Sequence, residues 1–281
     1  MKTRKSFTID EITAIKPNEK IALVATINDE GLPHVTLLTS LLALDDTHMA
    51  LGEFSKGVSK EYIKKNNEIG FCILTMNMDM WRGKARYTHS AKEGPEYEMF
   101  NEFPMFRYNT YFGINTVHFF DLVQVNEKEK LPLGAIAKAS IATLLAKWKT
   151  KQQKAEKPLG VLGFELFNRL DALKFAAWID SDGFPKIVPV LQAKASDTGT
   201  IVFSPLAYTE ELLQLKQGMP VAIYALTLKM ENILTRGIFQ GYKRYAGIKL
   251  GLCDINWVYN SMPPVHGQIY PPVPLQPVKE F

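Results

Sequence analysis

Two serines and two lysines, Ser55, Lys56, Ser59 and Lys60, lie close together in a polar loop that runs into a predicted helix. Hydroxyl groups, lysine ammonium groups and the unpaired N–H groups of a helix start all bind anions. The grouping therefore predicts a site for a phosphate or a similar anion. The alternative interpretation is a serine that caps the helix, with the lysines in solvent.

Two further cationic side chains, Lys84 and Arg86, alternate on one face of a predicted strand next to Trp81. They could form a second anion contact or an ordinary exposed strand face. The five histidines predict no metal site, because His34, His48, His89 and His118 stand in separate segments without ligand-like spacing. The fifth, His266, lies in a Pro-rich tail.

The elements that must position these residues occur twice. The hairpin Ile27-Asn28-Asp29-Glu30-Gly31-Leu32-Pro33 returns 152 residues later as Ile179-Asp180-Ser181-Asp182-Gly183-Phe184-Pro185. Short polar residues followed by Gly are typical of a tight turn, and the flanking apolar runs are typical of strands. The repeat predicts a duplicated domain. It is supported by Arg82-Gly83 against Arg236-Gly237 and by Arg107-Tyr108 against Arg244-Tyr245.

Each copy predicts about six strands with a helix between the third and fourth, which suits a small closed barrel. The loop that matches Ser55–Lys60 in the second copy, residues 204–211, has no basic residue and carries Glu210 and Glu211. We therefore expect one anion site per chain, in the first copy. The predicted helices are 7–16, 59–67, 93–103, 164–170 and 209–217, and the predicted strands are 21–27, 33–44, 48–52, 68–77, 81–89, 113–125, 173–179, 185–193, 200–203, 221–228, 235–241 and 250–259.

The predicted domains are 1–127 and 161–262, joined by a Lys-rich helical linker, 128–160, and followed by an extended Pro-rich arm, 263–281. In the linker helix, apolar residues at helical spacing predict one buried stripe with lysines mostly off it. That stripe consists of Ala137, Ser140, Ile141, Leu144, Leu145 and Trp148.

Composition limits the class of protein. The 281 residues are 46% hydrophobic and 22% charged, with a net charge of +4, as in ordinary globular proteins. The linker holds eight lysines against two glutamates, so the domains themselves are not basic and a nucleic-acid partner is not expected. No apolar run is long enough to span a membrane, and no membrane partner is expected. Two cysteines in apolar runs, Cys72 and Cys253, predict buried thiols and a cytoplasmic protein.

This order of elements resembles the pyridoxamine 5′-phosphate oxidase-like family of FMN-binding split barrels, over residues 7–125 and 163–262. The resemblance rests on the Gly-X-Pro hairpin, on the Ser/Lys segment that opens the helix, and on Gly83. It implies a mainly β fold with peripheral helices (α+β), built as two tandem six-stranded split β-barrels. The family works as a homodimer with FMN between the barrels, so a tandem duplication resembles that dimer fused into one chain, a pseudo-dimer that could itself dimerise.

The resemblance also implies the cofactor contacts. It places the flavin phosphate at Ser55, Lys56, Ser59 and Lys60, and it places ring and ribityl contacts on the strand after the hairpin, at Thr36, Leu38, Thr39 and Ser40. Lys84 is the further candidate contact. No catalytic acid or base is predicted.

The function expected from these residues is an FMN-binding flavoprotein, an oxidoreductase that transfers hydride or electrons between the flavin and a small-molecule substrate or electron donor. Two alternatives stay open. One is a haem-binding or haem-degrading split barrel that uses His266, and the other is a non-catalytic small-molecule binding protein.

Overall fold

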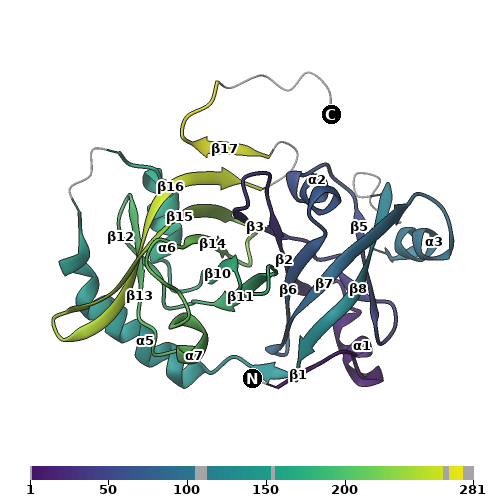
Figure 1. Cartoon of the computed structure of the whole chain (residues 1–281), viewed down its shortest axis with the longest axis horizontal. Coiled ribbons are helices and arrows are strands. Elements are labelled where there is room, and N and C mark those ends of the chain that lie inside the picture. The colour runs from purple at the N-terminus through teal and green to yellow at the C-terminus, as the bar shows by residue number, and fades with distance from the viewer. Residues whose placement is uncertain (1, 105–112, 153–155, 262–265, 275–281) are drawn as a thin grey trace. The chain divides into compact units, whose positions relative to one another are not determined.

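A computed structural model describes residues 2–104, 113–152, 156–261 and 266–274 (Figure 1). Contacts along the chain group it into two compact units. Unit 1 contains residues 1–31, 36–131 and 179–186, and unit 2 contains residues 32–35, 132–178 and 187–281. The two hairpin tips, 32–35 and 179–186, are thus each grouped with the unit formed by the other half of the sequence. The domain boundaries predicted from the sequence stay a prediction.

The first half of the chain forms one antiparallel sheet with the strand order β3-β2-β6-β7-β8-β5-β4, and β1 and β9 pair at its margins. The strands are β1 (Thr3–Arg4), β2 (Lys20–Ile27), β3 (Pro33–Leu37), β4 (Leu42–Ala43), β5 (His48–Glu53), β6 (Glu68–Thr75), β7 (Asp79–Ala91), β8 (Thr116–Asn126) and β9 (Glu129–Lys130).

The second half repeats this order as β11-β10-β14-β15-β16-β13-β12, with β17 paired to β16. Its strands are β10 (Leu173–Ile179), β11 (Pro185–Pro189), β12 (Lys194–Asp197), β13 (Thr200–Phe203), β14 (Pro220–Leu226), β15 (Asn232–Tyr245), β16 (Ile248–Asn260) and β17 (Gly267–Tyr270). The predicted duplication is therefore present in the hydrogen-bond topology itself.

Each sheet is a barrel with one open seam. β3 and β4 stand at opposite ends of the strand order, yet only residues 38–41 separate them in the chain. A link this short can join the two edges only if the sheet curls until they meet. β11 and β12 have the same relation across residues 190–193. The predicted fold, mainly β with two tandem split barrels, is confirmed.

The strand count is higher than the six predicted for each barrel. The expected strand 33–44 is interrupted by a turn, in which Leu41 N–H donates to Leu38 O at 3.0 Å. The expected strand 185–193 ends in the matching turn, in which Ala193 N–H donates to Val190 O at 2.7 Å, and β12 follows as a strand that was not predicted. The turn is needed because the chain crosses the seam at that point. Each main sheet path consequently has seven strands.

Gly83 and Gly237, which the predicted alignment of the two copies pairs, occupy equivalent places in the two barrels. A Cβ on Gly83 would collide with the carbonyl oxygen of Gln124, and one on Gly237 would collide with that of Asp254. Both positions lie next to a register shift between neighbouring strands. Neighbouring backbones approach there too closely for any side chain. The Arg107-Tyr108 part of the alignment lies outside the described residues.

The helices are α1 (Ile9–Ile15), α2 (Val58–Lys65), α3 (Pro95–Glu102), α5 (Leu133–Ala146), α6 (Gly160–Asn168) and the single-turn α7 (Thr209–Leu212), with a 3-10 turn, η2 (Lys147–Thr150). Thr8 caps α1 in a capping box with Glu11. The predicted helix 209–217 is shorter than expected, because after Leu212 the backbone forms i→i+3 bonds, Gln214 N–H to Glu211 O and Leu215 N–H to Leu212 O.

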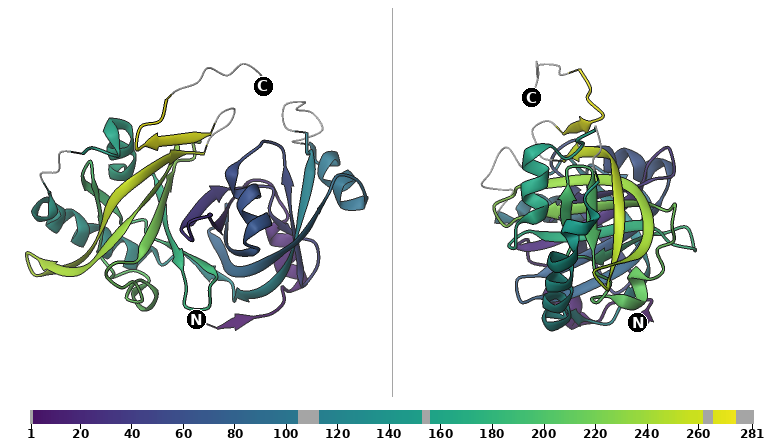
Figure 2. Two further views of the ribbon diagram at one scale, coloured as in Figure 1. Left: turned by 45° about the horizontal axis from the view of Figure 1, so that its top comes forward. Right: turned by 90° about the vertical axis from the view of Figure 1, so that its left-hand side faces the viewer.

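The predicted orientation of the linker helix is wrong. α5 packs against β13 and β16 (Figure 2) through small residues, with Ala139, Thr143 and Ala146 fully buried. The large residues of the predicted stripe, Ile141, Leu144, Leu145 and Trp148, are exposed instead. A helix that lies close to a sheet leaves room only for small side chains between the two backbones.

Candidate functional site

The predicted anion site lies where β5 ends and α2 begins, in unit 1. α2 has Gly57 as its N-cap, and no side chain caps its first turn. The ammonium of Lys60 folds back over this start, since its Nζ is 3.2 Å from the place that a Cβ on Gly57 would take. Glycine thus leaves room for the ammonium at the positive end of the helix dipole. A cation and helix N–H groups at one point favour an anion.

Lys60 is buried, with 5% of its surface exposed. Its Nζ donates to the carbonyl oxygen of Ser55 at 2.8 Å, and an ammonium has three hydrogens to donate. Burial lowers the pKa of Lys60, and the nearby carboxylate of Glu53 partly opposes this shift. An anion bound here would favour the charged form of Lys60 and would gain from the low local dielectric.

Glu53 and His118 form a buried pair next to this lysine. His118 Nε2 and Glu53 Oε2 are 2.8 Å apart, and the His118 side chain is 1% exposed. Burial raises the pKa of Glu53, but the hydrogen bond to His118 and the charge of Lys60 outweigh it, so that the pKa lies below its ordinary value. Glu53 therefore interacts both with His118, through a hydrogen bond, and with Lys60, through its charge.

The other predicted phosphate contacts surround the same helix start. Ser59 is buried in the first turn of α2, Ser55 is half-buried, and Lys56 is exposed. The structure therefore brings Ser55, Ser59 and Lys60 together around Gly57, with Lys56 in solvent beside them. Their assignment to a flavin phosphate stays a prediction.

The matching loop of the second barrel lacks these features. Its helix, α7, has one turn, and its N-cap residue Tyr208 is left-handed at φ 54°. Thr209 Oγ1 donates to Pro205 O at 2.7 Å. Glu210 and Glu211 occupy the first turn. Carboxylates at this position repel an anion, as expected from the sequence.

The strand residues Thr36, Leu38, Thr39 and Ser40 lie at the end of β3 and in the turn across the seam. Ser40 is fully buried, and its Oγ donates to the carbonyl of Gly52 at 2.7 Å. At the matching positions of the second barrel, Gln192 donates to the carbonyl of Ser204 at 2.9 Å. The same side-chain bond in both barrels gives Ser40 a structural role. Leu38 is buried in the core of the first barrel, and the two threonines are half-buried.

Lys84 is engaged by carboxylates. Its Nζ is 2.6 Å from Asp182 Oδ2 and 3.1 Å from Asp180 Oδ2, on the hairpin tip that belongs to unit 1. The Lys84 side chain is 8% exposed. These contacts give Lys84 a role in holding the tip. The neighbouring Arg86 lies over the ring of Phe184, 5.5 Å from its centre.

Sequence reasoning missed Glu53 and His118 as members of this site. His118 lies opposite Leu51 in the β5–β8 ladder, and Glu53 is the residue two positions farther along β5. Residues two apart share a face of a strand. The strand alternation could have indicated that face, but only the register between β5 and β8 brings the two side chains together.

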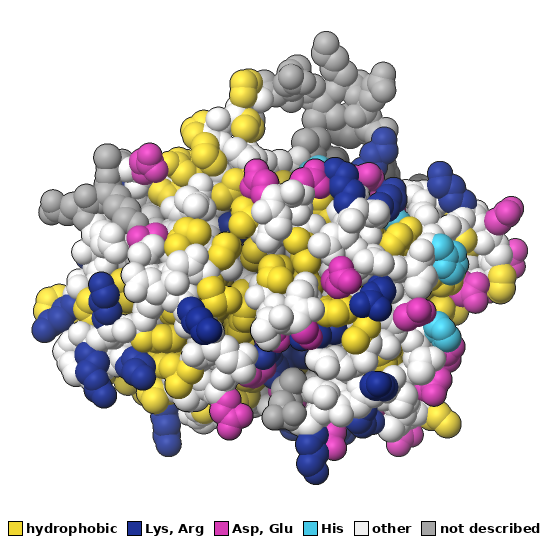
Figure 3. Space-filling model, viewed as in Figure 1, with side chains coloured by type: hydrophobic (Ala, Val, Ile, Leu, Met, Phe, Trp, Pro, Cys, Tyr) yellow, Lys and Arg dark blue, Asp and Glu magenta, His cyan; other side chains and the backbone are white. Residues whose placement is uncertain are grey.

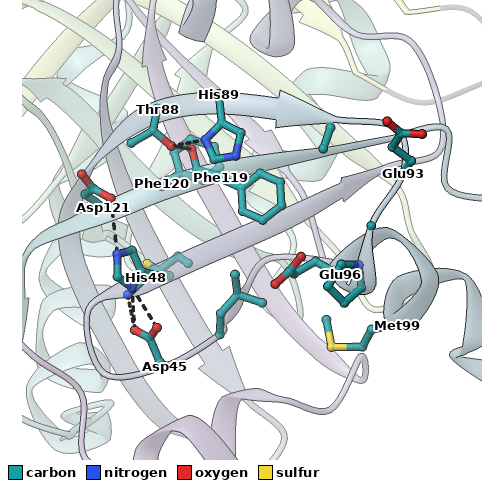
Figure 4. Close-up of a pocket in the computed structure, with 15 residues that line it drawn as sticks. Asp45, His48, Thr88, His89, Glu93, Glu96, Met99, Phe119, Phe120 and Asp121 are labelled. Carbon is teal, nitrogen blue, oxygen red and sulfur yellow. Dashed lines mark hydrogen bonds and ion pairs between the residues drawn. The ribbon is translucent and has the colours of Figure 1, made fainter.

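A separate pocket of about 860 Å³ lies at the other end of β5, where no predicted site residue lines it (Figure 4). His48 points between Asp45, at 2.8 Å, and Asp121, at 3.8 Å. The hydrogen bond to Asp45 raises the pKa of His48. The wall also holds Glu93 and Glu96, and among the described residues that line it there is no lysine or arginine. Such a wall suits a basic small molecule better than a phosphate.

His266, the residue of the haem alternative, is part of an aromatic cluster in unit 2. Its Nδ1 and the hydroxyl of Tyr259 are 2.6 Å apart. Tyr259 stacks on Trp257 at 5.2 Å, and His34 meets Tyr259 edge-on at 5.2 Å. Burial lowers the pKa of His34 to about 3. Packing within unit 2 accounts for these contacts, and the haem alternative stays untested.

Neither a metal site nor a membrane-spanning helix is found in the described residues. No group of three or more His, Cys, Asp or Glu side chains in this part of the chain could hold a metal ion. Within the same residues, no helix has the length and apolar character needed to cross a bilayer.

No protein-family model and no curated protein sequence matches the chain. Among solved structures, it is similar to an FMN-binding protein from Syntrophomonas wolfei, at 16% identity over 43% of this chain and 88% of that one, with a TM-score of 0.36. It is also similar to a stress protein 26-related member of the pyridoxinephosphate oxidase family from Clostridium acetobutylicum. That match has 15% identity over 43% and 87% of the two chains, with a TM-score of 0.33.

A third similar structure is an FAD-binding protein from Mesorhizobium loti, at 14% identity over 45% of this chain and all of that one, with a TM-score of 0.30. The predicted resemblance to pyridoxamine 5′-phosphate oxidase-like proteins is confirmed as a likeness. Each match covers less than half of this chain. What the chain binds has to be inferred from its own residues.

Proposed function

We propose that the chain binds FMN, with the flavin phosphate at the start of α2, and that it acts as a flavin-dependent oxidoreductase. The observation that carries the proposal is the buried ammonium of Lys60 folded over the uncapped helix start at Gly57. A buried ammonium is stabilised by opposite charge, and a phosphate would add to the carbonyl of Ser55 and the nearby carboxylate of Glu53, which already act on Lys60. The nearby carboxylate, Glu53, is bound to His118.

In this proposal, Lys60 and the N–H groups of the first turn of α2 bind the phosphate, and Ser55 and Ser59 supply hydroxyl groups beside it. Glu53 and His118 form a hydrogen-bonded pair next to Lys60. The bound flavin would supply the hydride or electron transfer, while the protein supplies binding and electrostatics. The substrate or electron donor would be a small molecule.

The first measurement is the visible absorption spectrum of the freshly purified protein, with the released cofactor identified by mass. The proposal expects the two-banded spectrum of a flavin and the mass of FMN. A Soret band would contradict it and favour the haem alternative. A colourless protein that takes up neither cofactor would favour a non-catalytic binding protein.

The phosphate assignment is tested by comparing FMN with riboflavin, which lacks the phosphate. Lys60→Ala should weaken FMN binding about tenfold to a hundredfold, the value of a hydrogen bond between charged groups, and should leave riboflavin binding unchanged. Lys64→Ala is the matched control, because Lys64 is exposed on the same helix. Equal losses for both ligands, or no loss for FMN, would contradict the assignment.

The oxidoreductase part requires that the bound flavin be reduced. Anaerobic mixing of the FMN-loaded protein with NADH or NADPH should bleach the flavin absorption. If both nicotinamides and a chemical reductant such as dithionite leave a bound flavin oxidised, a redox role is contradicted.

A further inference from the structure

The side chains of α5 are distributed in the reverse of the usual order for a surface helix. The face against the barrel is made mainly of small residues, with Ile136 as its one buried large apolar side chain. Ala146 packs there against Val202, Leu250 and Leu252. The face turned to solvent carries the large apolar residues Leu133, Ile141, Leu144, Leu145 and Trp148. A helix that served only to cover the barrel would place its large apolar side chains inward.

The outward residues form a continuous stripe, because Ile141, Leu144, Leu145 and Trp148 follow helical spacing. Their exposed fractions run from 43% for Leu144 to 61% for Leu145. Single exposed apolar residues need no explanation, but a contiguous group marks an interaction surface.

Trp148 is arranged to present its ring. Its Nε1–H donates to the carbonyl of Leu145 at 3.0 Å, so the indole keeps a hydrogen bond when water is removed from its surface. The ammonium of Lys149 lies 5.2 Å from the centre of the ring. Tryptophan with a neighbouring lysine is typical of residues at a membrane–water interface.

The charged side chains of α5 and η2 are all positive, and Asp197 accepts a hydrogen bond from the backbone of Gln152 just beyond them. Lys138, Lys149 and Lys151 are exposed, and residues 133–151 contain no acidic side chain. Figure 3 shows hydrophobic side chains interspersed with lysine and arginine at lower left, where Figure 1 draws α5. The occupant of this face should therefore combine an apolar layer with negative charge.

A second copy of the chain fits these features less well. Pairing α5 with α5 would bring lysines of both copies together. Five side chains that are each about half exposed also offer less than the ~800 Å² per partner of a stable interface. An anionic bilayer brings no lysines together and needs no large matching protein surface. Its acyl chains take up the apolar stripe, and its headgroups attract the lysines, at roughly 1 kcal/mol for each lysine.

We infer that α5 is a lipid-docking helix that places the chain on an anionic membrane surface. Both α5 and its lysines lie in unit 2, and the inference does not depend on flavin binding. The structure shows that the stripe predicted to be buried is exposed, and the inference departs from the expectation that no membrane is a partner.

The test is sedimentation of the full chain with vesicles of phosphatidylcholine alone and of phosphatidylcholine mixed with phosphatidylserine. Binding should require the anionic lipid and should weaken as salt rises. Ile141→Gln/Leu145→Gln should weaken it about tenfold or more. Leu228→Gln is the control, because Leu228 is 71% exposed outside the stripe. Urea unfolding of both variants should match that of the native chain, since the changed residues are exposed.

Fluorescence gives an independent readout. Trp81 and Trp178 are buried, Trp257 is half-buried and stacked on Tyr259, and Trp148 is 60% exposed, so a blue shift on vesicle binding should disappear in Trp148→Phe. Absence of binding to the anionic vesicles would overturn the inference. A lipid-free dimer that Ile141→Gln/Leu145→Gln dissociates would also overturn it, by assigning the face to a second copy.

Discussion

At the scale of single residues, burial decides which charged groups have structural roles. Lys84 is almost as buried as Lys60, but two carboxylates hold Lys84, while Lys60 donates to a backbone carbonyl. The sequence makes the two lysines look equivalent as anion contacts. Only the partners supplied by the fold separate them.

The Glu53–His118 pair makes a prediction at this scale. Glu53→Gln should lower the free energy of unfolding at pH 7 by about 1–3 kcal/mol, because a charged hydrogen bond is lost in a buried place. The pKa of Glu53 is lower in the folded state than its ordinary value of 4.5. Its stabilising contribution is therefore present above pH 4.5 and is lost as the pH falls below it.

The measurement is urea unfolding at pH 7 and near pH 4. The native chain should lose stability between the two, and Glu53→Gln should lose less. Glu61→Gln is the control, since the Glu61 side chain is 69% exposed and should change stability by less than about 0.5 kcal/mol. If Glu53→Gln loses as much unfolding free energy between pH 7 and pH 4 as the native chain, the Glu53–His118 pair does not cause the loss of stability in acid.

At the scale of elements, both barrels use a buried lysine to bind the carbonyl groups at the end of the helix before the first hairpin. Lys20 Nζ donates to Ile15 O and Pro17 O at 2.7 and 2.8 Å, after α1. Lys174 Nζ donates to Arg169 O and Ala172 O, both at 3.0 Å, after α6. A cation at a helix C-terminus satisfies carbonyls that lack helical partners.

Lys174 predicts how stability responds to alkaline pH. Burial lowers its pKa to about 7, and the charge of Lys194 adds to the shift. Between pH 7 and 10.5 the unfolded chain therefore holds a proton that the folded chain releases, so this group makes stability rise with pH. Lys174→Met should reduce the rise between pH 7 and 9.5 in urea unfolding.

Lys243→Met, which changes an exposed lysine on β15, should keep the rise. If Lys174→Met and Lys243→Met respond to pH alike, the buried lysine is not the group that titrates.

At the scale of the whole molecule, duplication has produced two barrels with one strand order and different chemistry. The first barrel keeps glycine and lysine at the helix start, and the second has Tyr208 and two glutamates there. The predicted arrangement of the barrels as a pseudo-dimer, and a homodimer of the chain, stay predictions.

This asymmetry predicts one FMN per chain. Isothermal titration of the cofactor-free protein should give a stoichiometry near one, because Glu210 and Glu211 disfavour a phosphate in the second loop. Lys60→Ala should lower the FMN affinity of that single site, and no second binding event should become visible in the titration. Two equivalent binding events per chain would contradict the assignment to the first barrel alone.

Local chemistry in the sequence determined much of this protein. The two hairpins, the capping box of α1, the close strand contact at Gly83 and Gly237, and the Ser/Lys helix start all follow from residue type and short spacing, because turns, caps and alternation are local interactions.

The tertiary structure decided the rest. Strand register placed Glu53 beside His118, the hairpin tip supplied the carboxylates that hold Lys84, and the seam turn gave Ser40 a backbone partner. The orientation of α5 also depended on the fold, since helical spacing identifies a stripe but does not say which face a barrel will cover. These outcomes depend on contacts between residues far apart in the chain, and local patterns contain no information about which distant partner will be adjacent.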